Sequence, residues 1–305
     1  MTPRVSLVVD EELAGLLAAG ERAVFRGVPG QGLVPLERAE ALAEERADIA
    51  RRARAAWLLG VCRSATGTYG PALAGLTSAA SDPEVPAELR SLPASAVGAI
   101  QRQLGRHAEG RDWDRSALDS AAGDPEAECE ALLGLASDAV GLGEPDAAQD
   151  AVDRVELLLA DRPLWWRHHI RLDWARAEAA LLAGDPGQAR AAAERALDAA
   201  EAASAPRHVA KSLLFAGVAA TSAGQQAAAV DLLARAAVLA EGLGARPLVW
   251  PSRGLLGALL AGSSPVESER SLEGARAVIR GIAADLPPLL AAEWLARRDI
   301  RALLG

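Results

Sequence analysis

Small and apolar residues recur along the chain at one fixed spacing. From Gly60, further small or apolar residues stand 7, 12, 16 and 19 positions on, at Gly67, Ala72, Leu76 and Ala79. The same steps recur from three later starting points, which are Ala136, Ala177 and Gly217. A spacing that repeats in this way predicts an array of similar structural units rather than one irregular domain.

Two further copies fit the spacing less well. One begins at Gly105, where Ala117 and Ala121 fall at the expected steps but Asp112 replaces the second glycine. Another begins at Gly257, and its apolar residues lie six positions late, which predicts an insertion around residues 262–265. The starts at 60, 105, 136, 177, 217 and 257 together predict about six repeats.

Within one copy, the spacing predicts two helices joined by a turn. The small first residue lets a second helix approach closely, and the residue twelve positions later meets it. The glycine at step seven ends the first helix, because glycine adopts the left-handed cap conformation without steric cost. The last two residues of the pattern lie on one face of the second helix. Such a pair cannot cover its own apolar faces, so neighbouring pairs must stack.

This pattern resembles the tetratricopeptide repeat (TPR) family, and residues 57–83, WLLGVCRSATGTYGPALAGLTSAASDP, carry it best. The later copies are similar to the longer, degenerate repeats of bacterial regulatory proteins. The closing EWLARRDIRALLG resembles the last capping helix of such arrays. Arg176 departs from the pattern, because the family prefers Leu at that position. The resemblance covers about residues 52–305 and implies an all-α fold, a right-handed α-solenoid of about six helix-turn-helix repeats.

The two ends of the chain do not follow the spacing. Residues 10–26 read as one amphipathic helix, GVPGQGLVP as a loop, and Pro35 as the start of a helix that can pack on the first repeat. We therefore divide the chain into an N-terminal helical cap (1–51), a TPR-like solenoid (52–286) and a C-terminal capping helix (287–305).

Composition agrees with a helical chain and argues against several classes of protein. Ala, Leu, Arg and Glu dominate and favour helices, whereas the chain has two Phe and one Tyr. A net charge of -9 argues against direct nucleic-acid binding, which needs a basic face. No apolar run reaches the ~18 residues of a membrane span. Two isolated cysteines, Cys62 and Cys129, and the absence of an export signal predict a cytoplasmic protein in which both are buried.

The sequence contains no motif that predicts catalysis, a cofactor or a metal. GVPGQG lacks the Lys-Ser/Thr of a phosphate-binding loop, and HExxH, paired-cysteine and GxSxG motifs are missing. His168 and His169 are adjacent, so on a helix their side chains diverge by about 100° and cannot easily share one ion. His169 and Asp173 have the spacing of ligands, but an ion pair between Asp173 and Arg176 is the commoner outcome. We predict a non-enzymatic protein without cofactor or metal.

Residues 164–171, LWWRHHIR, hold two of the seven Trp and two of the four His. Asp161 as the N-cap and Gly184 as the stop predict a helix of about twenty residues here. Apolar residues lie on two opposite sides of this helix, so it is expected to be wedged between neighbours. One polar side between them carries Arg167, Arg171 and Glu178.

By resemblance to the repeat family, the concave groove is lined by residues matching Arg171, Trp174 and Glu178. The equivalent rows in the other clear copies are Arg54, Trp57 and Val61; Glu130, Leu133 and Ser137; and Lys211, Leu214 and Val218. Three of the four rows begin with a cation, and Lys211 is the one lysine of the chain. Arginine can hold a carboxylate through two hydrogen bonds while Trp supplies a flat apolar wall. We therefore predict a groove site for acidic groups, with ordinary solvated charges as the alternative, at Arg54, Trp57, Arg167, Arg171, Trp174, Glu178 and Lys211.

Two functions fit these observations. The first is a non-catalytic scaffold or adaptor that binds a protein or peptide, with acidic groups, in the concave groove. The second is a sensory or regulatory module that responds to a peptide or small ligand and controls a transcription or signalling partner. A homodimer through the C-terminal helix is a further expectation, because this helix carries the apolar residues Leu289, Leu290, Trp294 and Leu295.

Overall fold

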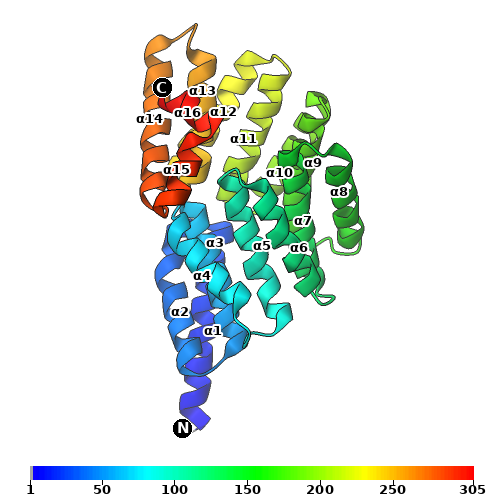
Figure 1. Ribbon diagram of the computed structural model, residues 1–305, viewed down its shortest axis with the longest axis vertical. Helices are drawn as coiled ribbons and strands as arrows, with labels where there is room; N and C mark the ends of the chain where they lie inside the picture. Colours follow the sequence, from blue (N-terminus) through cyan, green and yellow to red (C-terminus); the bar gives the residue numbers. More distant parts are fainter. Residues whose placement is uncertain (1–2) are drawn as a thin grey trace.

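The computed structural model describes the backbone of residues 3–305 and the side chains of residues 10–305, and this part of the chain is helical throughout (Figure 1). It contains sixteen α-helices and one short 3-10 helix. Their bounds are α1 (Pro3–Arg26), η1 (Pro29–Gly32), α2 (Leu33–Glu45), α3 (Ile49–Thr66), α4 (Tyr69–Ser81), α5 (Ala87–Gln103), α6 (His107–Ser120), α7 (Pro125–Leu142), α8 (Pro145–Leu159), α9 (Trp166–Leu182), α10 (Pro186–Ala202), α11 (Pro206–Ser222), α12 (Gln226–Gly242), α13 (Arg246–Leu260), α14 (Pro265–Ala284), α15 (Pro288–Ala296) and α16 (Arg298–Leu304).

Helices α3 to α14 form six consecutive antiparallel pairs, each packed against the next, which confirms the predicted TPR-like array. The predicted turn glycines have the expected left-handed conformation, with φ of +76° at Gly67, +75° at Gly143, +76° at Gly184 and +70° at Gly224. The close approach within a pair is also confirmed. A Cβ built on Gly60 would lie 2.3 Å from the Cγ atom of Leu76, so only glycine fits this crossing without movement of the leucine.

The second repeat corrects the predicted register. Gly105 has φ of +82° and lies in the turn between α5 and α6, whereas the small residue at the helix crossing is Gly98. From Gly98 the standard steps reach Gly105, Gly110, Asp114 and Ala117, so this repeat is regular. The pattern is hidden because Asp114, fully buried at 0% exposure, occupies the core position that Leu76 fills in the first repeat.

The sixth repeat contains no six-residue insertion, so that prediction was wrong. Helix α13 ends at Leu260 and α14 begins at Pro265, which leaves an ordinary short connection. Gly257 meets α14 at Ser268, whose hydroxyl donates to the Gly257 carbonyl at 2.7 Å, and a Cβ on Gly257 would lie 2.7 Å from the Cγ atom of Leu272. The residues at this crossing are small or polar. The apolar spacing therefore resumes only later in α14, and in the sequence this delay suggested an insertion.

Helix α9 begins later than predicted. Trp165 is its N-cap, and Asp161 and Pro163 lie in the turn that precedes it. The reason lies in that turn, where the Arg162 carbonyl accepts from the Trp165 backbone N–H at 3.1 Å and lies 3.0 Å from Nε2 of His169. Helix α2 in turn begins at Leu33, two residues before Pro35, which leaves Pro35 within its first turn.

The array curves until its last repeat rests on its first, as the stacking of α13 to α16 above α3 and α4 shows in Figure 1. Arg246 donates to the Thr66 carbonyl at 2.6 Å and to Oδ2 of Asp285 at 2.8 Å. Arg297 donates to the Gln103 carbonyl at 2.9 Å. Around these bonds, one apolar core joins the two ends of the array, with Tyr69, Ile100, Ile282, Leu286, Trp294 and Ile300 among its members. The array therefore curves back until its last repeat contacts its first, and we call this curved array the ring.

The C-terminal helices help to close this ring. Trp294 is 1% exposed and meets Trp250 edge to face at 6.4 Å between ring centroids, so it is not available for the predicted homodimer contact. Leu289 of the same helix is 72% exposed. Both cysteines are buried, as predicted. Among the described helices, none is long and apolar enough to cross a membrane.

Candidate binding site

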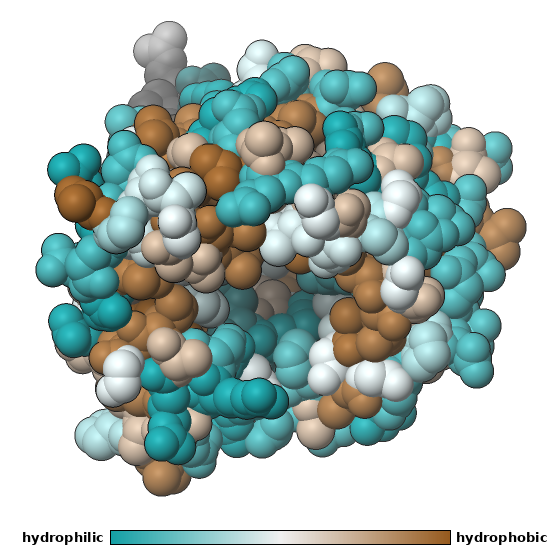
Figure 2. Space-filling view, turned by 90° about the horizontal axis from the view of Figure 1, so that it is seen from above, coloured by the Kyte–Doolittle hydropathy of each residue, from teal (hydrophilic) through white to brown (hydrophobic). Residues whose placement is uncertain are grey.

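The ring surrounds a central cavity of about 380 Å³, and Figure 2 shows the hollow from above, with both hydrophilic and hydrophobic residues around it. The first helix of every repeat contributes to the lining, because equivalent positions on successive first helices face the same side of the array. Many side chains of this lining are charged or aromatic. They include Phe25, Trp57, Arg102, Glu130, Arg167, Arg171, Trp174, Glu178, Arg207, His208 and Lys211.

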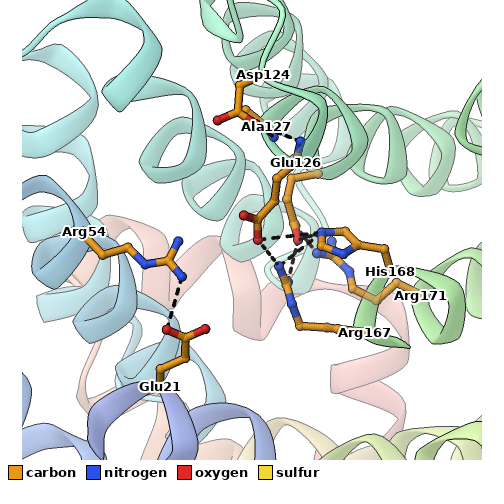
Figure 3. A network of polar contacts seen from close by, with 9 residues as sticks. Glu21, Arg54, Asp124, Glu126, Ala127, Arg167, His168 and Arg171 are labelled. Atoms are coloured by element: carbon orange, nitrogen blue, oxygen red, sulfur yellow. Dashed lines mark hydrogen bonds and ion pairs between the residues drawn. The ribbon is translucent and has the colours of Figure 1, made fainter. Parts of the chain in front are cut away.

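Six of the seven predicted groove residues line this cavity, which are Trp57, Arg167, Arg171, Trp174, Glu178 and Lys211. Arg54 does not belong to the lining. Its guanidinium carbon lies 4.5 Å from the ring centroid of Trp57, and its Nη2 lies 3.3 Å from Oε2 of Glu21 on α1. Figure 3 shows this pair apart from the cluster around Arg167. Arg54 therefore binds a residue of α1, a helix outside the repeats, and does not line the cavity.

Arg167 and Arg171 both bind Glu130, a residue of the preceding repeat (Figure 3). Nη1 of Arg167 lies 2.5 Å from Oε1 of Glu130, and its Nη2 lies 3.0 Å from Oε1 of Glu126. Glu130 and Arg171 begin equivalent rows on adjacent first helices, so the repeat itself brings their opposite charges together. These two arginines therefore already have carboxylate partners within the protein.

The adjacent histidines point in different directions, as the sequence predicted. Nε2 of His168 lies 3.2 Å from Oε1 of Glu130, whereas Nε2 of His169 faces the Arg162 carbonyl at 3.0 Å. Burial, together with repulsion from Arg167, lowers the pKa of His168 to about 3, so this imidazole is neutral at physiological pH. Among the described residues, no three His, Cys, Asp or Glu side chains gather in an arrangement that could hold a metal ion.

Lys211 packs against aromatic rings on the cavity wall. Its Nζ lies 4.4 Å from the ring centroid of Trp174 and 5.4 Å from that of Phe215, within the range of a cation–π interaction. The Trp174 ring is held in place by a hydrogen bond from its Nε1 to Oγ of Ser212 at 2.9 Å. Burial lowers the pKa of Lys211 to about 8, and the nearby Glu178 carboxylate opposes that change.

Two cavity residues, Arg207 and His208, were missed in the sequence. Arg207 lies one helical turn before Lys211, so the spacing of four residues was the signal that would have found it. His208 stands between Trp166 and Trp174, each at 5.3 Å between ring centroids. Phe25 was also missed. It comes from α1 in the N-terminal cap, where no repeat spacing relates it to the cavity.

A second buried charge cluster borders the cavity at Arg102. Its Nη1 binds Asp114 and lies 3.1 Å from Oδ2 of Asp138, and both aspartates are fully buried. Burial raises the pKa of Asp138 to about 8. Because Arg102 is enclosed by these two carboxylates, it contributes little net charge to the cavity.

A second cleft of about 490 Å³ lies between α1 and the start of α9. It is lined by residues that include Arg22, Arg26, Trp165 and Trp166. Phe25 and Arg167 line both this cleft and the central cavity, so they stand at the boundary between the two. The cleft therefore adjoins the central cavity.

Comparison with known proteins defines the fold. No protein-family model and no curated protein sequence matches the chain. Among solved structures, a Rap protein complexed with competence and sporulation factor matches with a TM-score of 0.64 and 13% identity, over 96% of this chain and 80% of that chain. Aspartyl phosphate phosphatase F from Bacillus subtilis matches with a TM-score of 0.52 and 11% identity, over 96% and 82%.

A tetratricopeptide repeat protein from Parabacteroides merdae matches over 96% of this chain and 98% of that chain, with a TM-score of 0.48 and 12% identity. Over most of its length the chain is therefore similar in structure to the Rap protein and to aspartyl phosphate phosphatase F, at low sequence identity. At these identities the likeness establishes the fold alone.

Proposed function

We propose that this protein is a non-catalytic binding module that receives a peptide, or a segment of a protein, with acidic groups in its central cavity. The observation that carries the proposal is the cavity lining, in which cations stand beside the flat rings of Trp57 and Trp174. Arginine and lysine bind carboxylates, and indole rings pack against apolar side chains. A volume of about 380 Å³ lies at the lower end of the range for ligand pockets, so the cavity suits a short segment.

The comparisons give this proposal limited support. One matched Rap structure contains competence and sporulation factor, so a related fold can bind a partner. Another is named a phosphatase, but a catalytic activity does not transfer at 11% identity. The cavity lining of this chain favours binding over catalysis, because its acidic side chains are engaged by arginine, serine or histidine.

A second candidate, a regulatory module, is favoured by the closure of the ring. A ligand in the cavity touches first helices from both ends of the array, so its binding is coupled to the contact between the last repeat and the first. A ligand shifts such an equilibrium by its difference in affinity for the closed and open forms. This function would require a separate effector protein that recognises one of the two forms.

The proposal can be tested by panning a phage-displayed library of seven-residue peptides against the immobilised full chain. We expect peptides with Asp or Glu to be enriched, and we expect Lys211→Glu to abolish their retention. Arg171 is unsuitable for charge reversal, because a glutamate there would face Glu130 and unfold the site. The matched control is Arg235→Glu, an exposed cation of α12 outside the cavity.

Circular dichroism of each variant establishes that it is folded before binding is compared. Equal retention by wild type and Lys211→Glu, or enrichment without acidic residues, would contradict the proposal. The regulatory candidate needs a second measurement, which is small-angle X-ray scattering of the protein with a recovered peptide. A change in radius of gyration supports regulation, and an unchanged radius supports a passive scaffold.

A further inference from the structure

Two cations of α11, Arg207 and Lys211, face the central cavity without a carboxylate partner. The other cations of the lining form ion pairs within 4.0 Å: Arg102 with Asp114 and Asp138, Arg167 with Glu126 and Glu130, and Arg171 with Glu130. Within the part of the chain whose side chains are described, no such pair includes Arg207 or Lys211. The two residues are four positions apart on one helix, so their side chains lie side by side.

The surroundings of Arg207 and Lys211 raise the free-energy cost of leaving these two cations unpaired. Burial lowers the pKa of Arg207 to about 10 and that of Lys211 to about 8, and repulsion from Arg171 adds to both effects. Nε of Arg207 is buried and has no hydrogen-bond partner. Both side chains are partly buried. A partly desolvated cation without an anion costs free energy, and a bound anion lowers that cost. Arg207 and Lys211 are therefore the two cations of the lining that a bound anion would stabilise.

His208 adds an unused hydrogen-bonding group to the same wall. It is 1% exposed and lines the cavity, and its Nδ1 and Nε2 are both buried without a hydrogen-bond partner. Burial and the neighbouring cations hold its pKa well below the ordinary value, so the ring is neutral. One nitrogen of a neutral imidazole carries a hydrogen and can donate it to an oxygen. Buried groups of this kind are normally satisfied, which points again to a missing partner.

The balance of charge indicates which anion fits. Outside the Arg102 cluster, the lining carries four cations, Arg167, Arg171, Arg207 and Lys211. Two carboxylates of the lining, Glu130 and Glu178, together with Glu126, which binds Arg167 from the adjoining cleft, leave a surplus of one positive charge. One carboxylate neutralises this surplus. A phosphate, with about two negative charges, would leave the cavity negative. The rings of Trp57 and Trp174 then provide an apolar surface for the chain that bears the carboxylate.

We propose that Arg207 and Lys211, assisted by His208, form a subsite for a single carboxylate of the bound peptide. This inference rests on the proposed peptide-binding function and adds the chemistry of one anchoring group. The carboxylate can come from the C-terminus of the peptide or from an Asp or Glu side chain. Both sources present the same planar anion to the guanidinium and the ammonium group.

Because Lys211 is the one lysine of the chain, it can be observed without interference. Protein labelled with [13Cε]lysine gives a single lysine resonance, whose dependence on pH reports the ionisation of Lys211 directly. The probes are acetyl-Ala-Leu-Ala with a free carboxyl end, the same tripeptide with an amide end, acetyl-Ala-Glu-Ala amide, and inorganic phosphate alone. The first and third probes separate a terminal carboxylate from a side-chain carboxylate.

We expect at least one carboxylate probe to raise the pKa of Lys211 from about 8 toward its ordinary value, because a nearby negative charge favours the protonated amine. The amide-capped acetyl-Ala-Leu-Ala should leave the titration unchanged. Arg207→Gln should weaken binding of the active probe by roughly tenfold, which is the effect of losing one charge-assisted hydrogen bond. The control Arg235→Gln should bind the probe as wild type does.

No effect of either carboxylate probe would overturn the subsite, and an effect of phosphate alone would overturn its assignment to a carboxylate. Equal effects of the free and the amide-capped tripeptide would also overturn it. Peptides that are retained in panning but leave the Lys211 resonance unchanged would refute the subsite and leave the proposed function intact. Failure of panning to retain any acidic peptide would instead refute the proposed function.

Discussion

Replacement of Gly60 by alanine tests the helix crossing on which every repeat depends. The added Cβ would lie 2.3 Å from Cγ and 2.4 Å from Cδ2 of Leu76, whereas carbon atoms in contact are normally about 3.5–4.0 Å apart. Leu76 is 0% exposed, so the leucine must leave its position or α3 and α4 must separate. Overpacking of this kind costs about 1–3 kcal/mol, and the better helix propensity of alanine returns up to about 1 kcal/mol. We expect a net loss of about 1–2 kcal/mol.

Gly75→Ala is the matched control, because it changes a glycine in α4 of the same repeat. The nearest atom to a Cβ at Gly75 is Nη1 of Arg63 at 3.9 Å, so the new methyl group meets no obstacle. This variant should gain about 0.5–1 kcal/mol from helix propensity alone. Urea unfolding followed by circular dichroism at 222 nm measures both variants, and their stabilities should differ by about 2 kcal/mol.

A double variant identifies the clash directly. Leu76→Ala alone should cost about 2–5 kcal/mol, but in the Gly60→Ala background it should cost less, because the new methyl group occupies part of the vacated space. Equal stability of Gly60→Ala and Gly75→Ala would refute the reasoning. Strict additivity of Gly60→Ala and Leu76→Ala would refute it as well.

Three further predictions concern the ring and its charged wall. Arg246→Ala removes the hydrogen bond to the Thr66 carbonyl that joins the last repeat to the first, so it should cost about 1 kcal/mol in urea unfolding at this partly exposed site; an unchanged stability would contradict a contribution of this bond to the contact between the two repeats. Glu130→Gln leaves two arginines without their shared carboxylate and should cost about 3–5 kcal/mol in urea unfolding, whereas a loss below about 1 kcal/mol would show the cluster to be solvated. The folded pKa of His168 is about 3 against 6.5 in the unfolded chain, so below pH 6.5 the unfolded state binds the extra proton and stability falls toward pH 3. His168→Gln should make that decline shallower, and an identical pH profile of unfolding would contradict the burial of a neutral imidazole.

Much of the fold could be predicted from the sequence, because the interactions that specify it join residues that are close together in the chain. Gly67 and Gly143 end helices through their own conformational freedom, and Gly60 permits a helix crossing to a partner only sixteen residues away. Each repeat contains the same short-range interactions, so these interactions appear in the sequence as a fixed spacing. The spacing failed in the second repeat because Asp114 fills an apolar position. Its burial depends on Arg102, which a search for apolar residues does not detect.

The candidate site was predicted less completely, although five of the six predicted residues that line it, all except Arg167, belong to rows that the repeat made recognisable. Arg54 belongs to such a row but turns to Glu21, which comes from the N-terminal cap. The place of Arg207 in the cavity could have been inferred from helical spacing, but it was overlooked. Phe25 could not have been found, because α1 carries no repeat that relates it to the cavity.

The helical pairs, their order and the face that each first helix presents follow from the sequence, since these depend on residues within about twenty positions of one another. The contact between the two ends of the array is visible only in the folded structure. That contact joins Arg246 to Thr66, and Arg297 to Gln103, across 180 and 194 residues. It depends on small rotations that accumulate from repeat to repeat, which no local spacing encodes. The same contact turns an open row of charges into an enclosed cavity, where burial makes the unpaired cations of α11 significant.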